Sequence, residues 1–447
     1  MNGKIEKIKV IMKTWMKGKL TIIGKIQVIK TFLISQLVYV MQSISLPEII
    51  LKELNSIIYR FLWKKNSLDC KAWERVRRPV LSNNKKIGGL EMINLIDFQK
   101  SFLISWACKL CNGHKEDWKQ FPLYFLKSVG GLSVFESNID STKFKGYDEI
   151  KSEFWRKVVK TWLETNKSEE IITKNDTINN NKYVTVNNHS LFLKNAIDNN
   201  ILYLKDVMDG ENIIPYTDYK DRVKENQECL IDYITIKVAI AKIKHKIVNV
   251  QREANIPKFH NINCMNINRK QVYQFLLSKE RCYCEAFWEK KINTKLHEST
   301  WENVFKYIKE IKLQELQWKI LHNIFPTNIL LNRMGITESE KCKDCGEKDH
   351  LEHYFYFCER NRNLWIKVNQ IIRKRIEIEI SLNMKIVLFG IEQDIVFDKL
   401  QAKEVQFINF MLLIAKFSII KSKTQNLNIN LLFDNELKLR NKDSNVN

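Results

Sequence analysis

Residues 342–358 read CKDCGEKDHLEHYFYFC, and this stretch predicts its own local fold more firmly than the rest of the chain. The spacing is Cys342, two residues, Cys345, seven residues, His353, four residues and Cys358. Zn²⁺ prefers four tetrahedral ligands, and both thiolate sulfur and imidazole nitrogen suit it. Three cysteines and one histidine close the coordination sphere and leave no position for water. We therefore expect one structural Zn²⁺, which holds shape and hydrolyses nothing.

Two histidines compete for the imidazole position. His350 would fit the retroviral knuckle C-x2-C-x4-H-x4-C, but that pattern needs a cysteine where this chain has Phe355. His353 and Cys358 are five residues apart, and a helix beginning near Leu351 could direct both at one point if its backbone flexes slightly. The alternative is a set of ordinary reduced cysteines in a helical core. Four ligands at metal spacing favour zinc, with His353 as the histidine.

The other cysteines give weaker signals. Cys108 and Cys111, with His114 nearby, have a metal-like spacing, but the surrounding pattern is that of an apolar helix, which favours buried packing. Cys282 and Cys284 have no ligand partners close in sequence. The ten cysteines of the chain do not form a secreted disulfide framework. We expect an intracellular location, in the nucleus or cytoplasm, and no secretion.

Composition and periodicity predict a mostly α-helical fold. The chain has 447 residues, of which 45% are hydrophobic, and only 13 Gly and 6 Pro, so turn-rich sheet folds are disfavoured. Apolar residues recur at steps of three and four in several stretches, as on one face of a helix. We expect helical stretches at about 20–40, 48–63, 95–110, 301–333, 363–380 and 401–423.

No membrane segment or leader is predicted. The N-terminus lacks the combination of a charged stretch, an apolar run and a small-residue cleavage site that marks a signal peptide. The most apolar segment, residues 405–420, is shorter than the ~18–20 residues that span a bilayer, and it contains Lys416. We interpret it as a buried helix and expect no membrane partner.

The formal net charge of +22 is unevenly distributed. Residues 1–118 contain 21 Lys and Arg against 9 Asp and Glu, so over half of the excess lies in about the first quarter of the chain. Such a balance favours polyanions, and we expect RNA or DNA bound mainly through phosphates. A basic surface that serves only solubility is the alternative. The candidate phosphate contacts are Lys25, Lys30, Lys64, Lys65, Arg75, Arg77, Arg78, Lys85 and Lys86.

Catalytic motifs are not visible in the sequence. Polymerases that use two metal ions need paired aspartates, and the chain contains no Asp-Asp pair. The string nearest to the Tyr-x-Asp-Asp of reverse transcriptases, residues 216–219, has a single aspartate. G-x-S-x-G, Walker and H-E-x-x-H patterns are also missing. We therefore expect no enzymatic activity and no small-molecule substrate.

Several strings along most of the chain resemble one family, and three of them are the most informative. The zinc segment CKDCGEKDHLEHYFYFCERNRNLW is similar to the zinc-binding domain of LINE-type (non-LTR) retrotransposon reverse transcriptases, with Glu352 before the histidine and Trp365 closing the pattern. Residues 17–40, KGKLTIIGKIQVIKTFLISQLVYV, resemble the family's thumb, which follows the catalytic palm. Residues 316–336, LQWKILHNIFPTNILLNRMGI, match the family's Leu-His…Pro-Thr-Asn turn at His322, Pro326, Thr327 and Asn328.

This resemblance implies the C-terminal part of a retrotransposon polyprotein, without the endonuclease, fingers and palm. It implies a helical thumb-like lobe that grips the template–primer duplex, followed by a helical C-terminal lobe that contains a small CCHC zinc-binding module and engages RNA and target DNA. The alternatives are a zinc-stabilised helical scaffold for protein partners, or a decayed transposon remnant without activity. A complete reverse transcriptase is a third hypothesis, which the missing Asp pair disfavours.

The expected organisation follows from these patterns and from the polar, Asn-rich composition of the middle of the chain. The expected parts are a thumb-like helical region at 1–160, a low-complexity linker at 161–189, a helical region at 190–336, the zinc-binding module at 337–366, C-terminal helices at 367–435 and a disordered tail at 436–447.

Overall fold

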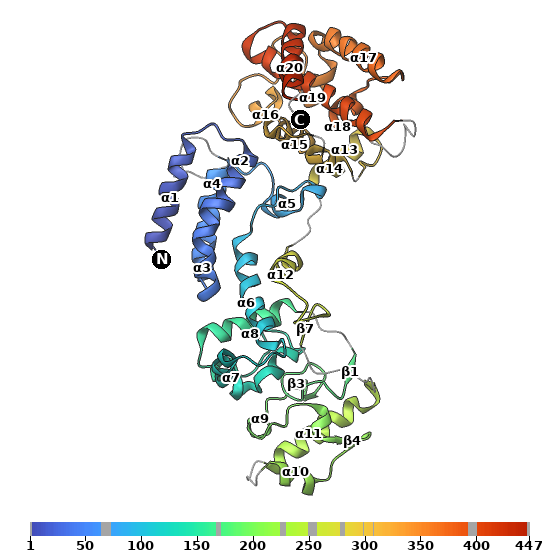
Figure 1. Cartoon of the computed structure of the whole chain (residues 1–447). Coiled ribbons are helices and arrows are strands. Elements are labelled where there is room, and N and C mark those ends of the chain that lie inside the picture. The colour runs from blue at the N-terminus through green and yellow to red at the C-terminus, as the bar shows by residue number, and fades with distance from the viewer. Residues whose placement is uncertain are drawn as a thin grey trace. The chain divides into compact units, whose positions relative to one another are not determined.

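A computed structural model describes most of the chain and confirms the mostly α-helical fold (Figure 1). The described ranges are 2–63, 73–166, 171–223, 229–248, 257–277, 282–297, 299–306, 308–391 and 400–444. The chain divides into two compact units. Unit 1 consists of residues 1–35, 53–94 and 278–447, and unit 2 consists of residues 36–52 and 95–277.

Unit 1 contains the C-terminal helices and the zinc segment, together with two stretches from the beginning of the chain. Its helices are α1 (Asn2–Met16), α2 (Ile22–Val28), the π-helix η1 (Ile29–Ile34), α5 (Arg78–Ser82), η2 (Lys85–Ile87), α13 (Tyr283–Ile292), α14 (Ser299–Lys306), α15 (Ile311–Leu321), α16 (Asn328–Arg333), the π-helix η9 (His353–Phe357), η10 (Glu359–Asn361), α17 (Arg362–Ile376), α18 (Met384–Phe389), α19 (Ala402–Gln425) and α20 (Ile429–Ser444). The boundary between the units falls near the start of α3 (Ser35–Ser43) and within α4 (Glu48–Trp63).

Unit 2 combines helices with four small two-stranded sheets among its described residues. Its α-helices are α6 (Leu95–Cys111), α7 (Gln120–Leu126), α8 (Glu153–Thr165), α9 (Lys194–Asp198), α10 (Tyr216–Arg222), α11 (Cys229–Ile243) and α12 (Arg269–Leu276). Short 3₁₀ segments are η3 (Asp117–Lys119), η4 (Lys127–Val129), η5 (Gly131–Glu136), η6 (Tyr147–Glu149), η7 (Leu204–Asp206) and η8 (Lys244–Lys246).

The strands of unit 2 pair locally, with one exception. β1 (Ile172–Thr173) lies parallel to β6 (Ile247–Val248). The remaining pairs are antiparallel hairpins, formed by β2 (Thr185–Val186) with β3 (His189–Ser190), β4 (Met208–Asp209) with β5 (Asn212–Ile213), and β7 (Lys258–Phe259) with β8 (Ile262–Asn263). α6 packs beside α8 and α12, as Figure 1 shows.

The predicted apolar stripe of residues 20–40 is confirmed at its beginning. Ile22, Ile26, Ile29 and Leu33 are all buried, and the helix starts where the Thr21 hydroxyl accepts a hydrogen bond from the Gly24 N–H. Such a side-chain acceptor satisfies one of the orphan amides of a helix N-terminus. The predicted helix at 48–63 has the same bounds as α4.

The expected division into two consecutive lobes is wrong. Residues 1–160 and 190–435 do not form separate lobes, because residues 1–35 and 53–94 pack with 278–447, and residues 95–160 pack with 171–277. The first grouping depends on long-range contacts, such as the hydrogen bond from the Trp318 indole N–H to the Gly88 carbonyl at 3.0 Å. Contacts between residues so far apart in sequence are not visible in a local pattern.

The prediction of a linker at 161–189 is also wrong. α8 continues to Thr165, and the described residues 171–189 contribute buried Ile178 and Val184 to a core of unit 2. The asparagines there form turns, since Asn180 donates to the Lys145 carbonyl and accepts from its N–H, at 2.9 and 2.8 Å. Asparagine side chains compete for backbone partners in this way, so the lack of periodicity reflects turns and not a linker.

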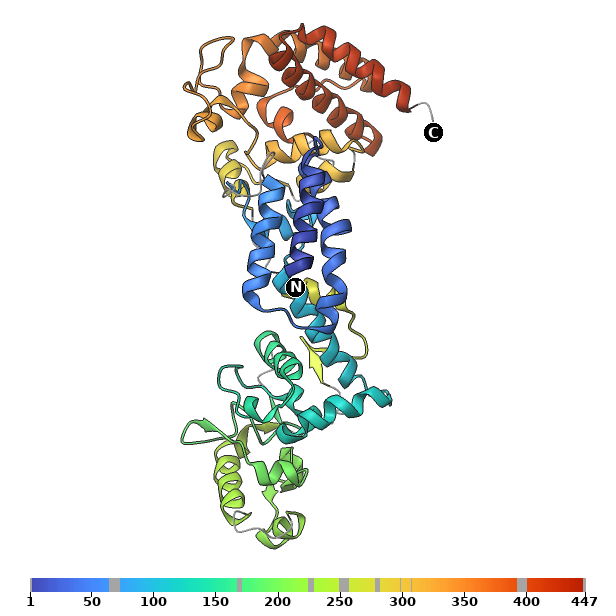
Figure 2. The same cartoon turned by 90° about the vertical axis from the view of Figure 1, so that its left-hand side faces the viewer.

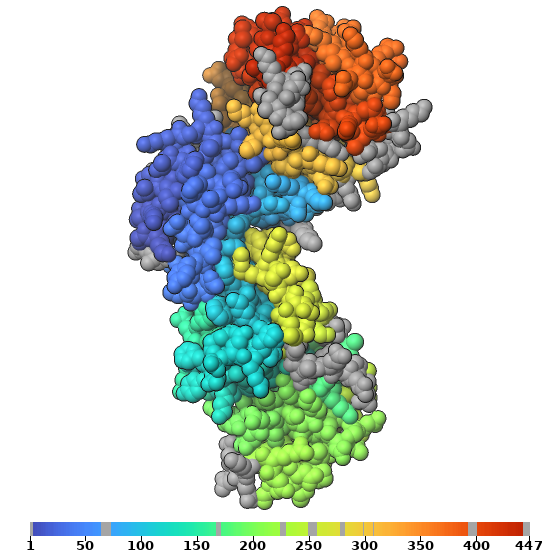
Figure 3. Space-filling model, in the orientation of Figure 1, coloured from blue at the N-terminus to red at the C-terminus, as the bar shows by residue number. Residues whose placement is uncertain are grey.

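The expected disordered tail is wrong for residues 436–444, which belong to α20. Glu436 is buried there, and its ion pair with Lys421 ties α20 to α19, while its ion pair with Arg440 lies within α20. Figure 2 shows α19 and α20 side by side, in red, and Figure 3 shows the same residues packed against the orange α17 region.

α19 is longer than its apolar segment suggested. It has 24 residues, because the helix continues past the apolar run at both ends. The helix is therefore long enough to span a bilayer, contrary to the prediction from the apolar run alone. Its apolar window is 61% buried inside the structure and contains buried Lys416, which fits the predicted core helix. The helical stretch Ile22–Ser43 is also long and apolar enough to pass the same test, with 44% of its window buried.

Candidate metal centre

The zinc segment begins with a tight turn. A β-bridge joins Lys341 to Lys348, and inside it the Cys342 N–H donates to the Glu347 carbonyl at 2.7 Å. The Gly346 N–H closes the turn on the Cys342 carbonyl at 3.0 Å. Gly346 has φ +76°, a conformation that favours glycine. The turn presents both sulfurs of the C-x2-C pair on the same side.

The second pair of ligands lies at the two ends of one π-helical turn. The helix starts at Leu351, as predicted, and changes to the π form over His353–Phe357. The Cys358 N–H then donates to the His353 carbonyl at 3.1 Å, five residues back. A π turn holds i and i+5 together, whereas an α-helix would separate them around its axis. The π-helix therefore accounts for the five-residue spacing.

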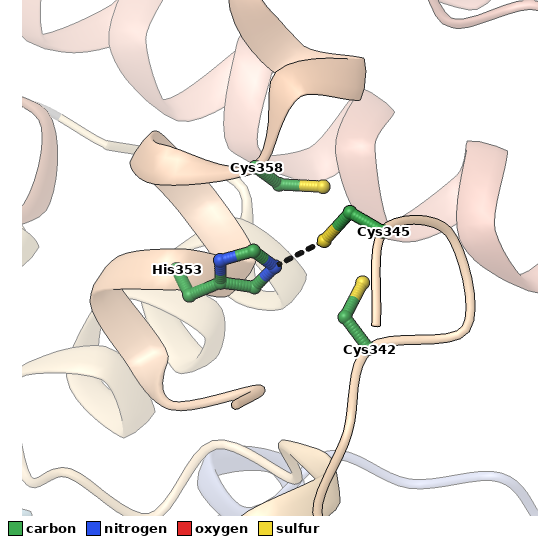
Figure 4. Close-up of side chains that lie close together, drawn as sticks. All are labelled: Cys342, Cys345, His353 and Cys358. Carbon is green, nitrogen blue, oxygen red and sulfur yellow. Dashed lines mark hydrogen bonds between the residues drawn. The ribbon is translucent and has the colours of Figure 1, made fainter. Parts of the chain in front are cut away.

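The four side chains converge on one point (Figure 4). The ligand atoms of Cys342, Cys345, His353 and Cys358 all lie within 4.8 Å of one another, and Cys345 Sγ is 3.2 Å from His353 Nε2. Sulfur and nitrogen atoms that share a tetrahedral Zn²⁺ are separated by about 3.5 Å. His350 is outside this group, and its Nδ1 accepts a hydrogen bond from the His353 N–H at 3.1 Å.

The environment of the ligands suits a structural ion. Cys342, His353 and Cys358 are buried, and Cys345 is the most exposed of the four. Burial lowers the pKa of His353, which favours the neutral imidazole that metals bind, and burial raises the pKa of Cys358 to about 12. A Zn²⁺ ion bound directly to the sulfur offsets the cost of deprotonating such a thiol.

A lysine from α19 completes the electrostatics of this centre. The Lys423 ammonium donates to Cys342 Sγ at 3.7 Å and lies 3.9 Å from both Asp344 and Asp349. Three thiolates and one Zn²⁺ carry a net charge of −1, which the ammonium partly compensates. Lys423 was missed in the sequence because it lies 65 residues beyond Cys358 and belongs to no ligand motif.

The Pro-Thr-Asn turn, which precedes the cysteine turn in the sequence, supports it through hydrogen bonds. The Asn328 backbone N–H donates to Asp349 Oδ2 at 3.0 Å, and its side-chain amide donates to the Lys341 carbonyl at 2.7 Å. Trp365 supports the π-helical turn, since its indole N–H donates to the Phe355 carbonyl at 2.8 Å. These bonds give a physical role to residues that entered only through the family resemblance.

Among the described residues, one further group has metal-ligand chemistry. Cys282, Cys284 and His322 are buried, with ligand atoms within 4.8 Å of one another. The sequence showed no partner for these cysteines because His322 lies 38 residues beyond Cys284. Cys108 and Cys111 are buried in the core of unit 2, as the apolar pattern of their helix favoured.

The candidate phosphate contacts have different environments. The prediction that Lys25 contacts phosphate is wrong, because its side chain is buried. Its ammonium donates to the carbonyls of Phe61 and Leu62 at 2.8 and 3.2 Å. It therefore holds α2 to α4 and is not available to a phosphate. Lys64 and Lys65 lie outside the described residues.

The remaining candidates lie on unit 1. Arg78 is held by a bidentate ion pair with Glu74 and stacks on the Tyr59 ring, 4.4 Å from its centroid. Arg77 and Lys86 are exposed, and Lys86 is 3.3 Å from Glu302. The partly buried candidates are Lys30, Arg75 and Lys85.

A family model described as zinc-binding in reverse transcriptase matches residues 268–365. The matched range contains all four converging ligands as well as the Pro-Thr-Asn turn. No curated protein matches the chain. Residues 268–365 are therefore a reverse-transcriptase zinc-binding domain, which holds one structural Zn²⁺ through Cys342, Cys345, His353 and Cys358.

Proposed function

We propose that this chain is the thumb and C-terminal part of a LINE-type retrotransposon reverse transcriptase, and that it binds RNA or DNA without catalysing polymerisation. The zinc-binding domain supports the link to reverse transcriptases. The thumb-like string at residues 17–40 supports the LINE-type assignment by resemblance. The net charge of +22 supports a polyanionic partner.

One juxtaposition carries the nucleic-acid proposal. Burial lowers the pKa of Lys30, Glu91 raises it with a carboxylate oxygen 3.9 Å away, and the positive charge of Lys85 lowers it further. The charge of Lys85, which lies 55 positions further along the chain, therefore acts on the Lys30 ammonium. Repulsion of this kind is relieved when a phosphate lies against both ammonium groups.

Lys86, the chain neighbour of Lys85, extends this basic site, which consists of Lys30, Lys85 and Lys86. Lys85 also lies over the Phe305 ring, 5.0 Å from its centroid, which limits the conformations of the side chain. A preordered ammonium loses less entropy when it binds a phosphate. Because these groups present charge without a base-reading element, we expect binding with weak sequence preference.

The non-catalytic part of the proposal rests on the missing aspartate pair. Asp218, in the string nearest to the polymerase motif, lies within helix α10, and its carboxylate accepts a hydrogen bond from Thr217. A two-metal centre needs two carboxylates that share ions. A primer-extension assay with a template–primer duplex and Mg²⁺ is expected to give no product, and template-dependent extension would refute this part.

A salt titration tests the binding part. Affinity of the full chain for an RNA–DNA template–primer duplex should fall steeply with salt, with a slope that reflects several phosphate contacts. Replacing Lys85 and Lys86 together by Gln should reduce that slope by about 1–2, since each contact contributes roughly 0.7–0.9. A flat salt dependence of the wild-type protein would refute binding through phosphates.

The control removes the same charge elsewhere. Lys9 and Lys52 form ion pairs with Glu6 and Glu48 within their own helices, and Lys9→Gln with Lys52→Gln should leave the slope unchanged. If both double variants lower the slope equally, the interaction is diffuse and the basic site is wrong. A scaffold that binds only proteins predicts no duplex retention at physiological salt in any variant.

A further inference from the structure

A second group of side chains that could bind a metal lies in unit 1, and it shares no residue with the CCHC centre. Cys282 is the residue before α13, Cys284 lies in the first turn of α13, and His322 follows the last residue of α15. All three are buried, and their Sγ, Sγ and imidazole nitrogen atoms lie within 4.8 Å of one another. Two helices are needed to bring them together.

The tautomer of His322 is fixed by the backbone. Its Nε2 lies 2.8 Å from the Gly88 carbonyl, which can only accept, so Nε2 carries the proton and Nδ1 presents a lone pair. Nδ1 is 3.6 Å from Cys284 Sγ. A histidine whose other ring nitrogen donates to a carbonyl is the usual arrangement of an oriented metal ligand.

Gly88 makes this approach possible. It has φ +84°, and a Cβ there would lie 2.8 Å from Cys282 Sγ and 3.1 Å from the Trp301 ring. Its carbonyl accepts from the Trp318 indole N–H as well as from His322. The Gly-Gly turn thus orients the histidine and packs directly against one of the two sulfurs.

We propose that Cys282, Cys284 and His322 form a second metal site, which binds Zn²⁺ through two thiolates and one imidazole. The separation of 3.6 Å between Cys284 Sγ and His322 Nδ1 is close to the roughly 3.5 Å expected for sulfur and nitrogen on one tetrahedral ion. Binding replaces two thiol protons, which pass to solvent, so two S–H bonds break and two Zn–S bonds form. The complex of Zn²⁺ with two thiolates is electrically neutral.

The net charge of the buried complex favours Zn²⁺ over Cu⁺, which also binds thiolates. Cu⁺ also favours cysteine and histidine ligands, but with two thiolates it would leave a net charge of −1 in a buried place. Burial lowers the pKa of His322 to about 4, which keeps the imidazole neutral at pH 7. The N-terminus of α13, a helix of ten residues, favours thiolate charge, whereas burial of Cys284 opposes it, and a Zn²⁺ ion bound directly to the sulfur offsets that cost. The three side chains leave the fourth tetrahedral position to a ligand from outside this group.

The site would join two segments of unit 1. Its ligands come from the zinc-binding domain, at residues 268–365, and its orienting carbonyl comes from the Gly88 turn, which lies 180 residues before the start of that domain. A bound ion would therefore stabilise the docking of the N-terminal segment onto the domain. This role is independent of nucleic-acid binding.

Metal stoichiometry of the full chain tests the proposal. The protein is purified under reducing conditions with Zn²⁺ in slight excess and is then freed of loosely bound metal. Elemental mass spectrometry should then show two zinc ions per chain. Cys284→Ala and Cys345→Ala should each lower the content to one, and the double variant to none. The control Cys111→Ala removes a buried thiol of unit 2 and should retain two.

A second measurement needs no variant that could fail to fold. Alkylation of native wild-type protein, followed by peptide mass spectrometry, should show Cys282 and Cys284 protected by Zn²⁺ and labelled at least tenfold faster after chelation, with Cys111 unchanged. One zinc per wild-type chain, with Cys284→Ala also retaining one, would overturn the proposal. Chelation that accelerates labelling of Cys345 but not of Cys282 and Cys284 would overturn it as well.

Discussion

The ammonium of Lys423 donates to Cys342 Sγ at 3.7 Å, although the two residues are 81 positions apart in the sequence. The same side chain lies over the Tyr354 ring, 4.0 Å from its centroid, and approaches two aspartates of the cysteine turn. α19 thereby supplies the positive charge that a Zn²⁺ centre with three thiolates lacks. The zinc centre depends on the C-terminal helices as well as on its own loop.

Removing this charge should weaken the metal without removing a ligand. Lys423→Met is expected to lower the affinity for Zn²⁺ by about 10- to 100-fold, the usual effect of losing a group that contacts a metal ligand. Competition with a chromophoric chelator measures the change. Lys423→Arg keeps the charge and should stay within a few-fold of wild type, and equal losses in both variants would show that packing, not charge, is the cause.

Removing a ligand should unfold the segment locally. Cys358→Ser leaves three ligands, and structural Zn²⁺ contributes ~10–16 kcal/mol to the folding of small zinc domains. We expect residues 337–366 to lose hydrogen-exchange protection while α6 and α8 of unit 2 keep theirs. Unchanged protection across 337–366 in this variant would show that packing alone maintains the segment.

Lys416 should make stability depend on pH. Its fully buried ammonium donates to Gln317 Oε1 at 2.6 Å, and burial lowers its pKa from 10.5 to about 7. Between pH 7 and 10 the unfolded chain therefore binds more protons than the folded one at this residue, and the free energy of unfolding should rise with pH by up to about 1.4 kcal/mol per unit. Below pH 7 both states are charged and this contribution is constant.

Lys416→Met should remove that dependence and stabilise unit 1 at pH 7 by about 2 kcal/mol, because the loss of the buried charge outweighs the unpaired Gln317 oxygen. Denaturant unfolding at pH 7, 8 and 9 measures the difference. Lys403→Met, on the exposed start of α19, is the control and should leave the pH profile unchanged. Identical profiles for Lys416→Met and wild type would contradict the assigned cause.

The Gly88 turn should not tolerate a side chain. Gly88→Ala places a methyl group 2.8 Å from Cys282 Sγ and puts alanine at a backbone position with positive φ. We therefore expect the free energy of unfolding to fall by about 3 kcal/mol or more, from strain and overpacking. Gly335 has φ +66°, and a methyl group added there would meet nothing within 4 Å, so Gly335→Ala should cost only about 1 kcal/mol. Thermal unfolding of both variants tests the difference, and equal losses would show that backbone strain alone operates.

The zinc ligands could be predicted because they are local in the chain. Cys342 and Cys358 are separated by only 16 positions, and a turn and one helical start suffice to bring them together. The π form of η9 could not be predicted, because the spacing of His353 and Cys358 indicates only a helix whose backbone flexes slightly. Helix periodicity was equally local, and α4 has the expected bounds.

Predictions that required knowledge of packing failed or were incomplete. The sequence predicts Lys25 as a phosphate contact, but its ammonium donates to the carbonyls at the end of α4 in the interior. The composition of the Asn-rich stretch before residue 190 predicts a linker, although the amide of Asn180 lies in a buried turn.

The order of the amino acids alone determined the helical class, the four ligands of the zinc centre and the positive charge, because each follows from residue type and short spacing. The tertiary structure decided which lysines are buried, that Lys423 faces the thiolates, and that His322 meets Cys282 and Cys284. These relationships arise when apolar helix faces pack against one another, which joins residues far apart in the chain.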